Sequence, residues 1–222
     1  MRKAGTLAAV ASSVLVIAST GQAAVTVTEF YRFGENDGAG IVDGSAIKVE
    51  TVSSVGSGKM WTQPWPNSSM VYSQDVPDAS RLPAGAESTL SVRLNGNNND
   101  AFLSSTGVAN PGITDNFGMQ VWIKPESLTG TQVVAYNGNN GQGGYGLILV
   151  DSQVRIHFGG VGSKTIGVPG LQANVWTHLA IVRDSGETRL FVNGVEVPQA
   201  TAMTIAPLAP LYSVKVGNYG FV

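Results

Sequence analysis

V-W-T-H-L-A-I-V-R-D-S-G-E-T-R-L-F-V-N-G-V-E-V, residues 175–197, is the stretch that decides the fold of this chain. Its β-branched and aromatic residues suit a pleated, packed strand surface. Turn residues interrupt the stretch at Asp184-Ser185-Gly186 and again at Asn193-Gly194. Asn-Gly between apolar runs favours a type I′ hairpin, because both central residues of that turn need φ > 0. The stretch therefore predicts three short antiparallel strands.

Strands with alternating side chains are predicted on both sides of this stretch. In residues 117–125, Phe117 and Val121 lie on one face of the predicted strand. In residues 153–158, Ile156 lies on the inward face. Further strands are predicted at residues 25–33, 47–50, 90–94, 101–103, 133–136, 145–150 and 212–216. Residues 53–85 carry four prolines and are predicted to form an irregular excursion held by Trp61 and Trp65.

Many short strands with Gly- and Asn-rich turns predict an all-β fold, a two-sheet antiparallel β-sandwich of the jelly-roll type. The two sheets would pack about 10 Å apart, with alternate side chains interdigitating. Phe117, Val121, Ile156 and Val192 are expected to share one dry interior.

Composition limits the function classes. The 222-residue chain has a net charge of -2, which gives no electrostatic reason to expect nucleic acid or an anionic membrane as a partner. With no cysteine, a disulfide framework and a thiolate metal site are excluded.

Residues 1–23 have a basic start, a short apolar run and small residues before a cleavage point, which predicts a signal peptide and a secreted chain from residue 24 to 222. The apolar run is shorter than the ~20 residues of a membrane span, so no span is expected in the mature chain.

Three segments resemble laminin-G-like jelly rolls of the concanavalin A-like lectin/glucanase superfamily. They are N-F-G-M-Q-V-W-I-K-P-E-S-L at 116–128, N-V-W-T-H-L-A-I-V-R-D at 174–184 and L-F-V-N-G at 190–194. The match covers about residues 90–222, and Y-R-F-G-E-N-D at 31–37 resembles the start of secreted bacterial surface members that carry a C-terminal sorting anchor. The chain departs from the family at residues 217–222, where the closing strand would begin. Compared with the family pattern, the chain is expected to be either a fragment or a natural truncation, and a missing closing strand would expose a sheet edge.

Candidate catalytic residues are few. Trp176 and His178 point the same way on one strand, but no serine and acid are marked to complete a catalytic set, so a structural role is expected. Glycosidases of the superfamily use paired carboxylates. The only close Glu-x-Asp is Glu35 with Asp37, in a turn, while three other glutamates are isolated at strand ends: Glu126, Glu187 and Glu196. No catalytic residue is assigned.

Ligand and metal sites are predicted in two polar loops. Residues 137–144 form a flexible loop in which Asn137, Asn139 and Asn140 could bind sugar hydroxyls beside stacking rings, of which Tyr145 is assigned to the site and Tyr136 and Trp122 are alternatives. Calcium binds carboxylate and amide oxygens, and its candidate loops are Asp100 with Asn98 and its neighbours, and Asp37 with Asn36. The alternative is simple turn chemistry. His157 and His178 are too few for a zinc site.

These features predict a secreted or cell-surface, non-catalytic module that binds glycan or an extracellular protein. This step depends on the family resemblance, because fold alone does not determine function. Two alternatives remain: a structural module of surface or matrix architecture, and a polysaccharide hydrolase or lyase of the same superfamily.

Overall fold

A computed structural model describes residues 26–35, 37–47, 50–62, 70–82, 87–94, 101–104, 112–167, 171–198 and 204–217. Within these ranges the chain is nearly all-β, with one short 3-10 helix, η1 (Ala79–Arg81). The predicted leader and the predicted break before the closing strand lie outside the described residues, so both stay predictions.

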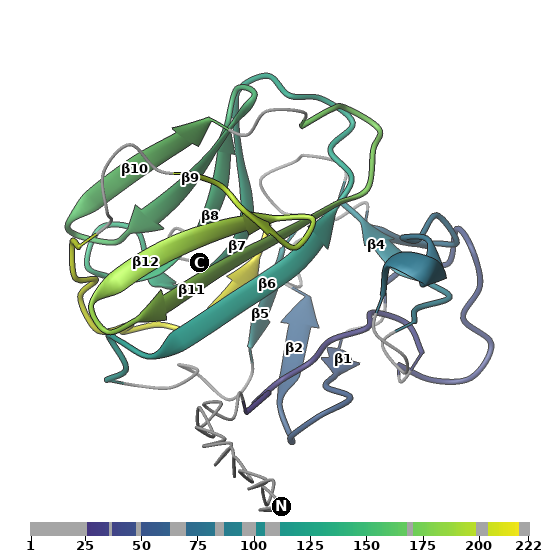
Figure 1. The fold of residues 1–222 in the computed structure, drawn as a ribbon. Coiled ribbons are helices and arrows are strands. Elements are labelled where there is room, and N and C mark those ends of the chain that lie inside the picture. The colour runs from purple at the N-terminus through teal and green to yellow at the C-terminus, as the bar shows by residue number, and fades with distance from the viewer. Residues whose placement is uncertain are drawn as a thin grey trace, which may run out of the picture.

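Two antiparallel sheets form the layers of a sandwich (Figure 1). The eight-stranded sheet has the order β1 (Glu50–Val52), β2 (Lys59–Thr62), β5 (Phe102–Ser104), β14 (Val214–Val216), β7 (Thr131–Asn139), β8 (Gly143–Val150), β9 (Gln153–Phe158), β10 (Gly162–Gly167). The four-stranded sheet, in front of it in Figure 1, has the order β13 (Val195–Glu196), β12 (Glu187–Val192), β11 (Thr177–Asp184), β6 (Phe117–Ile123). A separate ribbon pairs β3 (Val71–Ser73) with β4 (Ser91–Arg93).

The main hydrophobic core lies between the two sheets. Phe117 and Ile156 belong to its buried cluster, and Val121 and Val192 pack against that cluster. The predicted dry interior is therefore confirmed. Burying a side chain of this size stabilises the fold by roughly 1.5–3 kcal/mol, so this cluster is the main source of stability in a chain without cysteine.

The deciding stretch folds as predicted, into β11, β12 and β13. Ser185 and Gly186 have φ values of 52° and 82°, and Asn193 and Gly194 have φ values of 50° and 80°. Both turns thus need residues that tolerate a left-handed backbone, which glycine and asparagine do. The alternation buries Leu179, Ile181 and Leu190 completely.

The N-terminal part differs from the prediction. Residues 26–33 form no strand; Tyr31 makes an isolated bridge to Ser53, and Tyr31 and Phe33 pack against the cluster around Met60. The predicted irregular excursion instead contains β2, β3 and η1. Trp61 does not hold it together, because this side chain is 53% exposed, while Trp65 lies outside the described residues. A second cluster around Met60, Met70 and Phe102 provides the packing in this part.

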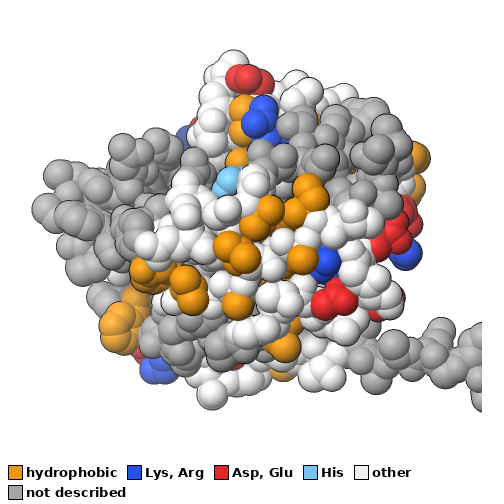
Figure 2. Space-filling view, turned by 90° about the vertical axis from the view of Figure 1, so that its left-hand side faces the viewer, with side chains coloured by type: hydrophobic (Ala, Val, Ile, Leu, Met, Phe, Trp, Pro, Cys, Tyr) orange, Lys and Arg blue, Asp and Glu red, His pale blue; other side chains and the backbone are white. Residues whose placement is uncertain are grey.

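One end of the sandwich carries an apolar surface (Figure 2). Among the exposed apolar residues, Val161 lies in the turn that joins β9 to β10, and Leu208 lies against that turn, since its Cδ1 would be 3.1 Å from a Cβ on Gly160. Among the described residues, no helix has the length and apolar character that crossing a bilayer requires.

Candidate functional site

The predicted sugar-binding loop is not a loop. Residues 137–144 form the ends of β7 and β8, joined by a turn. Asn137, Asn139 and Tyr145 are at most 3% exposed. Asn137 Nδ2 donates to the Tyr145 hydroxyl at 3.1 Å, and Asn139 Oδ1 accepts from the Gly141 N–H at 2.9 Å. These amides brace the hairpin, so of the four residues assigned to the site only Asn140, which is partly exposed, presents a side chain that a ligand could reach directly.

The proposed stacking rings are also covered. Tyr145 stacks on Phe117 with ring centroids 3.7 Å apart, and Tyr136 has no exposed surface. Burial raises the pKa of both tyrosine hydroxyls, so they stay protonated. Their aromatic area therefore contributes to the packing of the sandwich instead of binding a ligand.

The predicted calcium loop, with Asp100 and Asn98, lies outside the described residues and stays a prediction. At the alternative calcium site, the carboxylate of Asp37 accepts hydrogen bonds from its own fold. Its Oδ1 accepts from the Val52 N–H at 3.1 Å, and its Oδ2 accepts from the Tyr72 hydroxyl at 2.8 Å. In the part of the chain that the structure describes, no three histidine or carboxylate side chains gather as a metal site would need.

The other candidate carboxylates also have structural partners. Glu35 Oε1 accepts from the Thr89 hydroxyl and from the Leu90 N–H, at 3.2 and 3.3 Å. Arginines pair with the remaining three: Glu126 with Arg93, and both Glu187 and Glu196 with Arg189. Each of the five carboxylates considered for hydrolysis thus binds a group of its own fold.

His178 lies on the outer face of the four-stranded sheet. Its Nε2 is 3.2 Å from Gln120 Oε1, and its ring is tilted against Trp122 at a centroid distance of 5.2 Å. Burial, with a smaller effect of Arg81, lowers the pKa of His178. The imidazole is therefore neutral at neutral pH and hydrogen-bonds an amide, which agrees with the structural role expected from the sequence.

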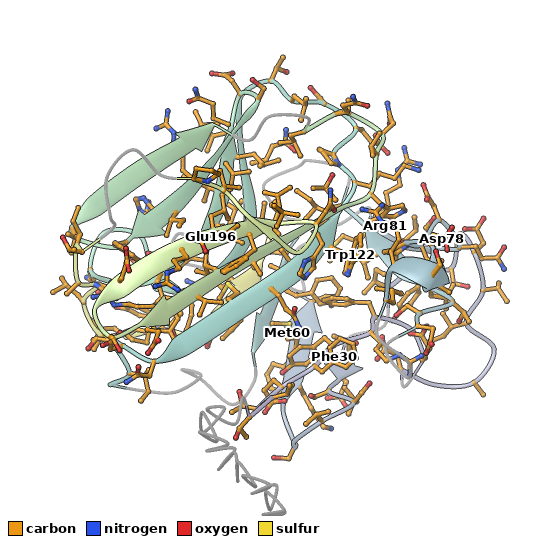
Figure 3. All side chains as sticks on the ribbon, in the orientation of Figure 1. Phe30, Met60, Asp78, Arg81, Trp122 and Glu196 are labelled. Carbon is orange, nitrogen blue, oxygen red and sulfur yellow. The ribbon has the colours of Figure 1, made fainter. Side chains whose placement is uncertain are left out.

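Arg81, from η1, covers Trp122 (Figure 3). Its guanidinium carbon is 4.8 Å from the centroid of the indole. Its two terminal nitrogens donate to the Trp176 carbonyl at 2.9 Å and to Asn193 Oδ1 at 2.7 Å. Asn193 also accepts from the His178 N–H at 3.0 Å. Arg81 therefore joins η1 and the residues before it to β6, to the residue that precedes β11, and to the turn between β12 and β13.

Asp75 makes the second attachment of the same segment. Its Oδ1 accepts from Trp176 Nε1 at 2.8 Å, and its Oδ2 pairs with Lys124. The bond from Lys124, followed by that from Trp176, lowers the pKa of Asp75. We name residues 74–82, with these contacts, the clasp. The clasp occupies one face of Trp122 and the N–H of Trp176, and both side chains are half-buried.

The outer face of the eight-stranded sheet carries a row of aligned residues. Strand pairing places Tyr136 between Lys215 and Gly146, and Gly146 opposite His157. Lys215 Nζ donates to the Gly138 carbonyl at 3.0 Å, and burial lowers the pKa of Lys215 and of His157. In this part of the row, the polar groups hold the β7–β8 hairpin.

The same row continues across β5 to β2 and β1, where its side chains are exposed. Trp61 pairs with Leu103 on one side and with Glu50 on the other. Its ring is 53% exposed, and the Lys59–Glu50 ion pair lies beside it with a distance of 2.7 Å. This corner combines an open aromatic ring with hydrogen-bonding groups. Sequence reasoning missed it, because Trp61 lies among prolines and serines and was not assigned to a strand.

Comparison with known proteins fits this architecture. A laminin G family model, described as the concanavalin A-like lectin/glucanases superfamily, matches residues 95–218, which is more than half of the chain. The chain belongs to this superfamily. The family resemblance and the sandwich expected from the sequence are thus confirmed.

The proteins that this chain resembles include a receptor, the binding domain of a mosquitocidal protein and a domain of an arabinanase. A 97-residue stretch, 40% of the chain, is 32% identical to adhesion G-protein coupled receptor V1 of Danio rerio and spans 2% of that protein's length. Among solved structures, the binding domain of Paraclostridial Mosquitocidal Protein 1 has 16% identity and a TM-score of 0.53, covering 79% of this chain and 43% of that one. This likeness shows the fold alone. Domain 4 of AbnA, an arabinanase of Geobacillus stearothermophilus solved with arabinotriose, has 17% identity and a TM-score of 0.46, covering 75% and 76%.

Proposed function

We propose that this chain is an exported, non-catalytic module that binds carbohydrate. The superfamily includes both lectins and glucanases by its own description, so membership leaves binding and hydrolysis open. The observation that favours binding is the use of the carboxylates. Glu35 and Asp37, the one Glu-x-Asp pair of the sequence, accept hydrogen bonds from Leu90, Val52 and Tyr72 and so hold the N-terminal part of the fold.

The surface supports the same proposal. A glycan presents hydroxyl groups and apolar C–H faces, which are recognised by planar polar side chains next to aromatic rings. The chain has few charges and a net charge of -2, which suits a neutral ligand better than a polyanion. Export is supported by the leader-like residues 1–23.

The test combines binding with hydrolysis in one preparation. Purified chain is incubated with insoluble cellulose, curdlan and arabinan, and both retained protein and released reducing sugar are measured. We expect retention on at least one polysaccharide without release of reducing ends. Reducing-sugar release that Glu35→Gln or Asp37→Asn abolishes would show a hydrolase instead, and absence of retention on all three would contradict carbohydrate binding.

A further inference from the structure

Trp61 is an exposed aromatic ring with a fixed place in the fold. It lies in β2 between two ladder partners, Glu50 in β1 and Leu103 in β5. The preceding residue, Met60, is 2% exposed and belongs to the second hydrophobic cluster. Because successive side chains of a strand point to opposite faces, the burial of Met60 directs Trp61 outward. The indole is 53% exposed although its backbone is held on both sides.

Two charged side chains lie along this ring. Lys59 precedes Trp61 by two residues on the same strand, so both point to the same face. Lys59 Nζ is 2.7 Å from Glu50 Oε1, across the strand pair. Lys59 first, and then the Trp61 indole N–H, lowers the pKa of the Glu50 carboxyl. The ring therefore has a carboxylate and an ammonium group at its edge, both in contact with solvent.

This arrangement matches the chemistry of a sugar ring. A pyranose or furanose has a face of C–H groups, which packs on an aromatic ring, and hydroxyl groups at its rim, which need hydrogen-bond donors and acceptors. We propose that Trp61, Glu50 and Lys59 form a subsite for one neutral sugar residue of a glycan. The proposal rests on the carbohydrate-binding function above and gives it a location.

The surroundings favour a sugar over a protein partner. The centre of a protein interface has several contiguous apolar side chains, whereas the described neighbours of Trp61 on this face include the Lys59–Glu50 pair. Two other tryptophans, Trp122 and Trp176, are engaged by Arg81 and Asp75 of the clasp. Of the tryptophans that the structure describes, Trp61 is the one whose side chain is exposed by more than a third, while Trp122 and Trp176 are half-buried.

The experiment measures binding of soluble oligosaccharides to the purified chain by titration calorimetry. The probes are arabinotriose, cellohexaose and laminarihexaose, and the variants are Trp61→Ala, Trp61→Phe and Leu211→Ala. Leu211 is the matched control, because it is 57% exposed and distant in sequence from β2. A second measurement records the oxidation of each tryptophan by N-bromosuccinimide, by mass spectrometry, with and without the sugar. This readout needs no variant and stays valid if Trp61→Ala does not fold.

We expect at least one probe to bind the wild-type chain. Trp61→Ala should weaken that binding by roughly tenfold or more, Trp61→Phe should weaken it less, and Leu211→Ala should leave it unchanged. The bound sugar should protect Trp61 from oxidation and leave the other tryptophans as they were.

The contrary outcomes separate the two proposals. Wild-type binding that Trp61→Ala leaves unchanged, without protection of Trp61, would overturn the subsite and leave carbohydrate binding intact. Absence of binding to the three probes and to the insoluble polysaccharides would overturn both. Self-association of the chain that Trp61→Ala abolishes, with sugar binding unaffected, would assign the ring to a protein interface and overturn the subsite.

Discussion

Arg81 shows how a single side chain can hold a segment onto a sheet. Its guanidinium lies over Trp122 and donates to the Trp176 carbonyl and to Asn193. Hydrogen bonds from a charged donor typically contribute about 1.5–3 kcal/mol, less when they are exposed as here. We therefore expect Arg81→Ala to lower the free energy of unfolding by roughly 1–2 kcal/mol, measured by urea denaturation. Arg81→Lys should recover only part of this, because an ammonium group lacks the planar fork of donors.

Arg93→Ala is the matched control for this prediction. Arg93 forms an ion pair with Glu126 at 2.8 Å, and both side chains are more than half exposed. Such surface pairs contribute about 0–1 kcal/mol. A loss of stability in Arg93→Ala as large as that in Arg81→Ala would show that the clasp contacts stabilise the fold no more than a surface ion pair does.

The two histidines predict how stability depends on pH. Burial is the main cause that lowers the pKa of both His157 and His178. The folded-state pKa is thus below the unfolded value of about 6.5, so the unfolded chain binds more protons as the pH falls. The stability that the neutral rings contribute is complete above about pH 6.5 and is lost as the pH falls through the lower folded-state values.

We therefore expect the free energy of unfolding to decrease from about pH 7 to about pH 5. A variant with both His157→Gln and His178→Gln should show a flatter slope over this window, whatever its absolute stability. Urea denaturation at fixed pH values measures both slopes. Carboxyl groups with a lowered pKa, such as Asp75, take up protons only below this pH window. The slope of the unfolding free energy within the window is therefore assigned to the histidines. Equal slopes in the two proteins would refute the assignment.

At the scale of single strands, two glycines differ in what surrounds them. A Cβ on Gly146 of β8 would lie 2.3 Å from the Ala135 carbonyl oxygen and 2.5 Å from Tyr136 Cδ2. A Cβ on Gly118 of β6 would meet its nearest atom at 3.6 Å. We expect Gly146→Ala to destabilise the fold by about 1–3 kcal/mol, because a paired backbone has no room to move. Gly118→Ala should be neutral or slightly stabilising, and thermal denaturation of the two variants compares them directly.

Strands with complete local patterns were predictable from the sequence. β6 has the predicted limits except for its last two residues, because its four inward side chains alternate without interruption. The β8–β9 hairpin was predictable for the same reason, with Val154 and Ile156 fully buried. β10 was missed because it begins and ends in glycine and has no alternation that would mark it.

Short strands depend on their partners, which explains the errors in the N-terminal part and at the site. β2 has four residues, and only its pairing with β1 and β5 makes it a strand. The contact between Glu50 and Trp61 follows from that register, so the sequence could not show it. The Asn- and Gly-rich residues 137–144 indicated a loop. Gly138 and Gly144, with φ values of 112° and 131°, instead let the two strands approach each other closely.

At the scale of the whole molecule, two hydrophobic clusters share one sheet. The main cluster includes Leu179, and the second includes Phe102. Val216 of β14 packs against both, and β14 pairs with β5 on one side and with β7 on the other. The backbone ladder and this shared side chain connect the N-terminal strands to the sandwich, so neither cluster should unfold without the other.

Two core variants test this coupling. Phe102→Ala and Leu179→Ala remove fully buried side chains, and we expect losses of about 3–5 and 2–5 kcal/mol. In both variants, urea transitions followed by tryptophan fluorescence and by far-ultraviolet circular dichroism should coincide as a single step. Val195→Ala, at a side chain 69% exposed, should leave the transition where it is. Separate transitions in Phe102→Ala would mean that β1, β2 and β5 form an independent unit, since the sandwich would then keep its structure after the second cluster had unfolded.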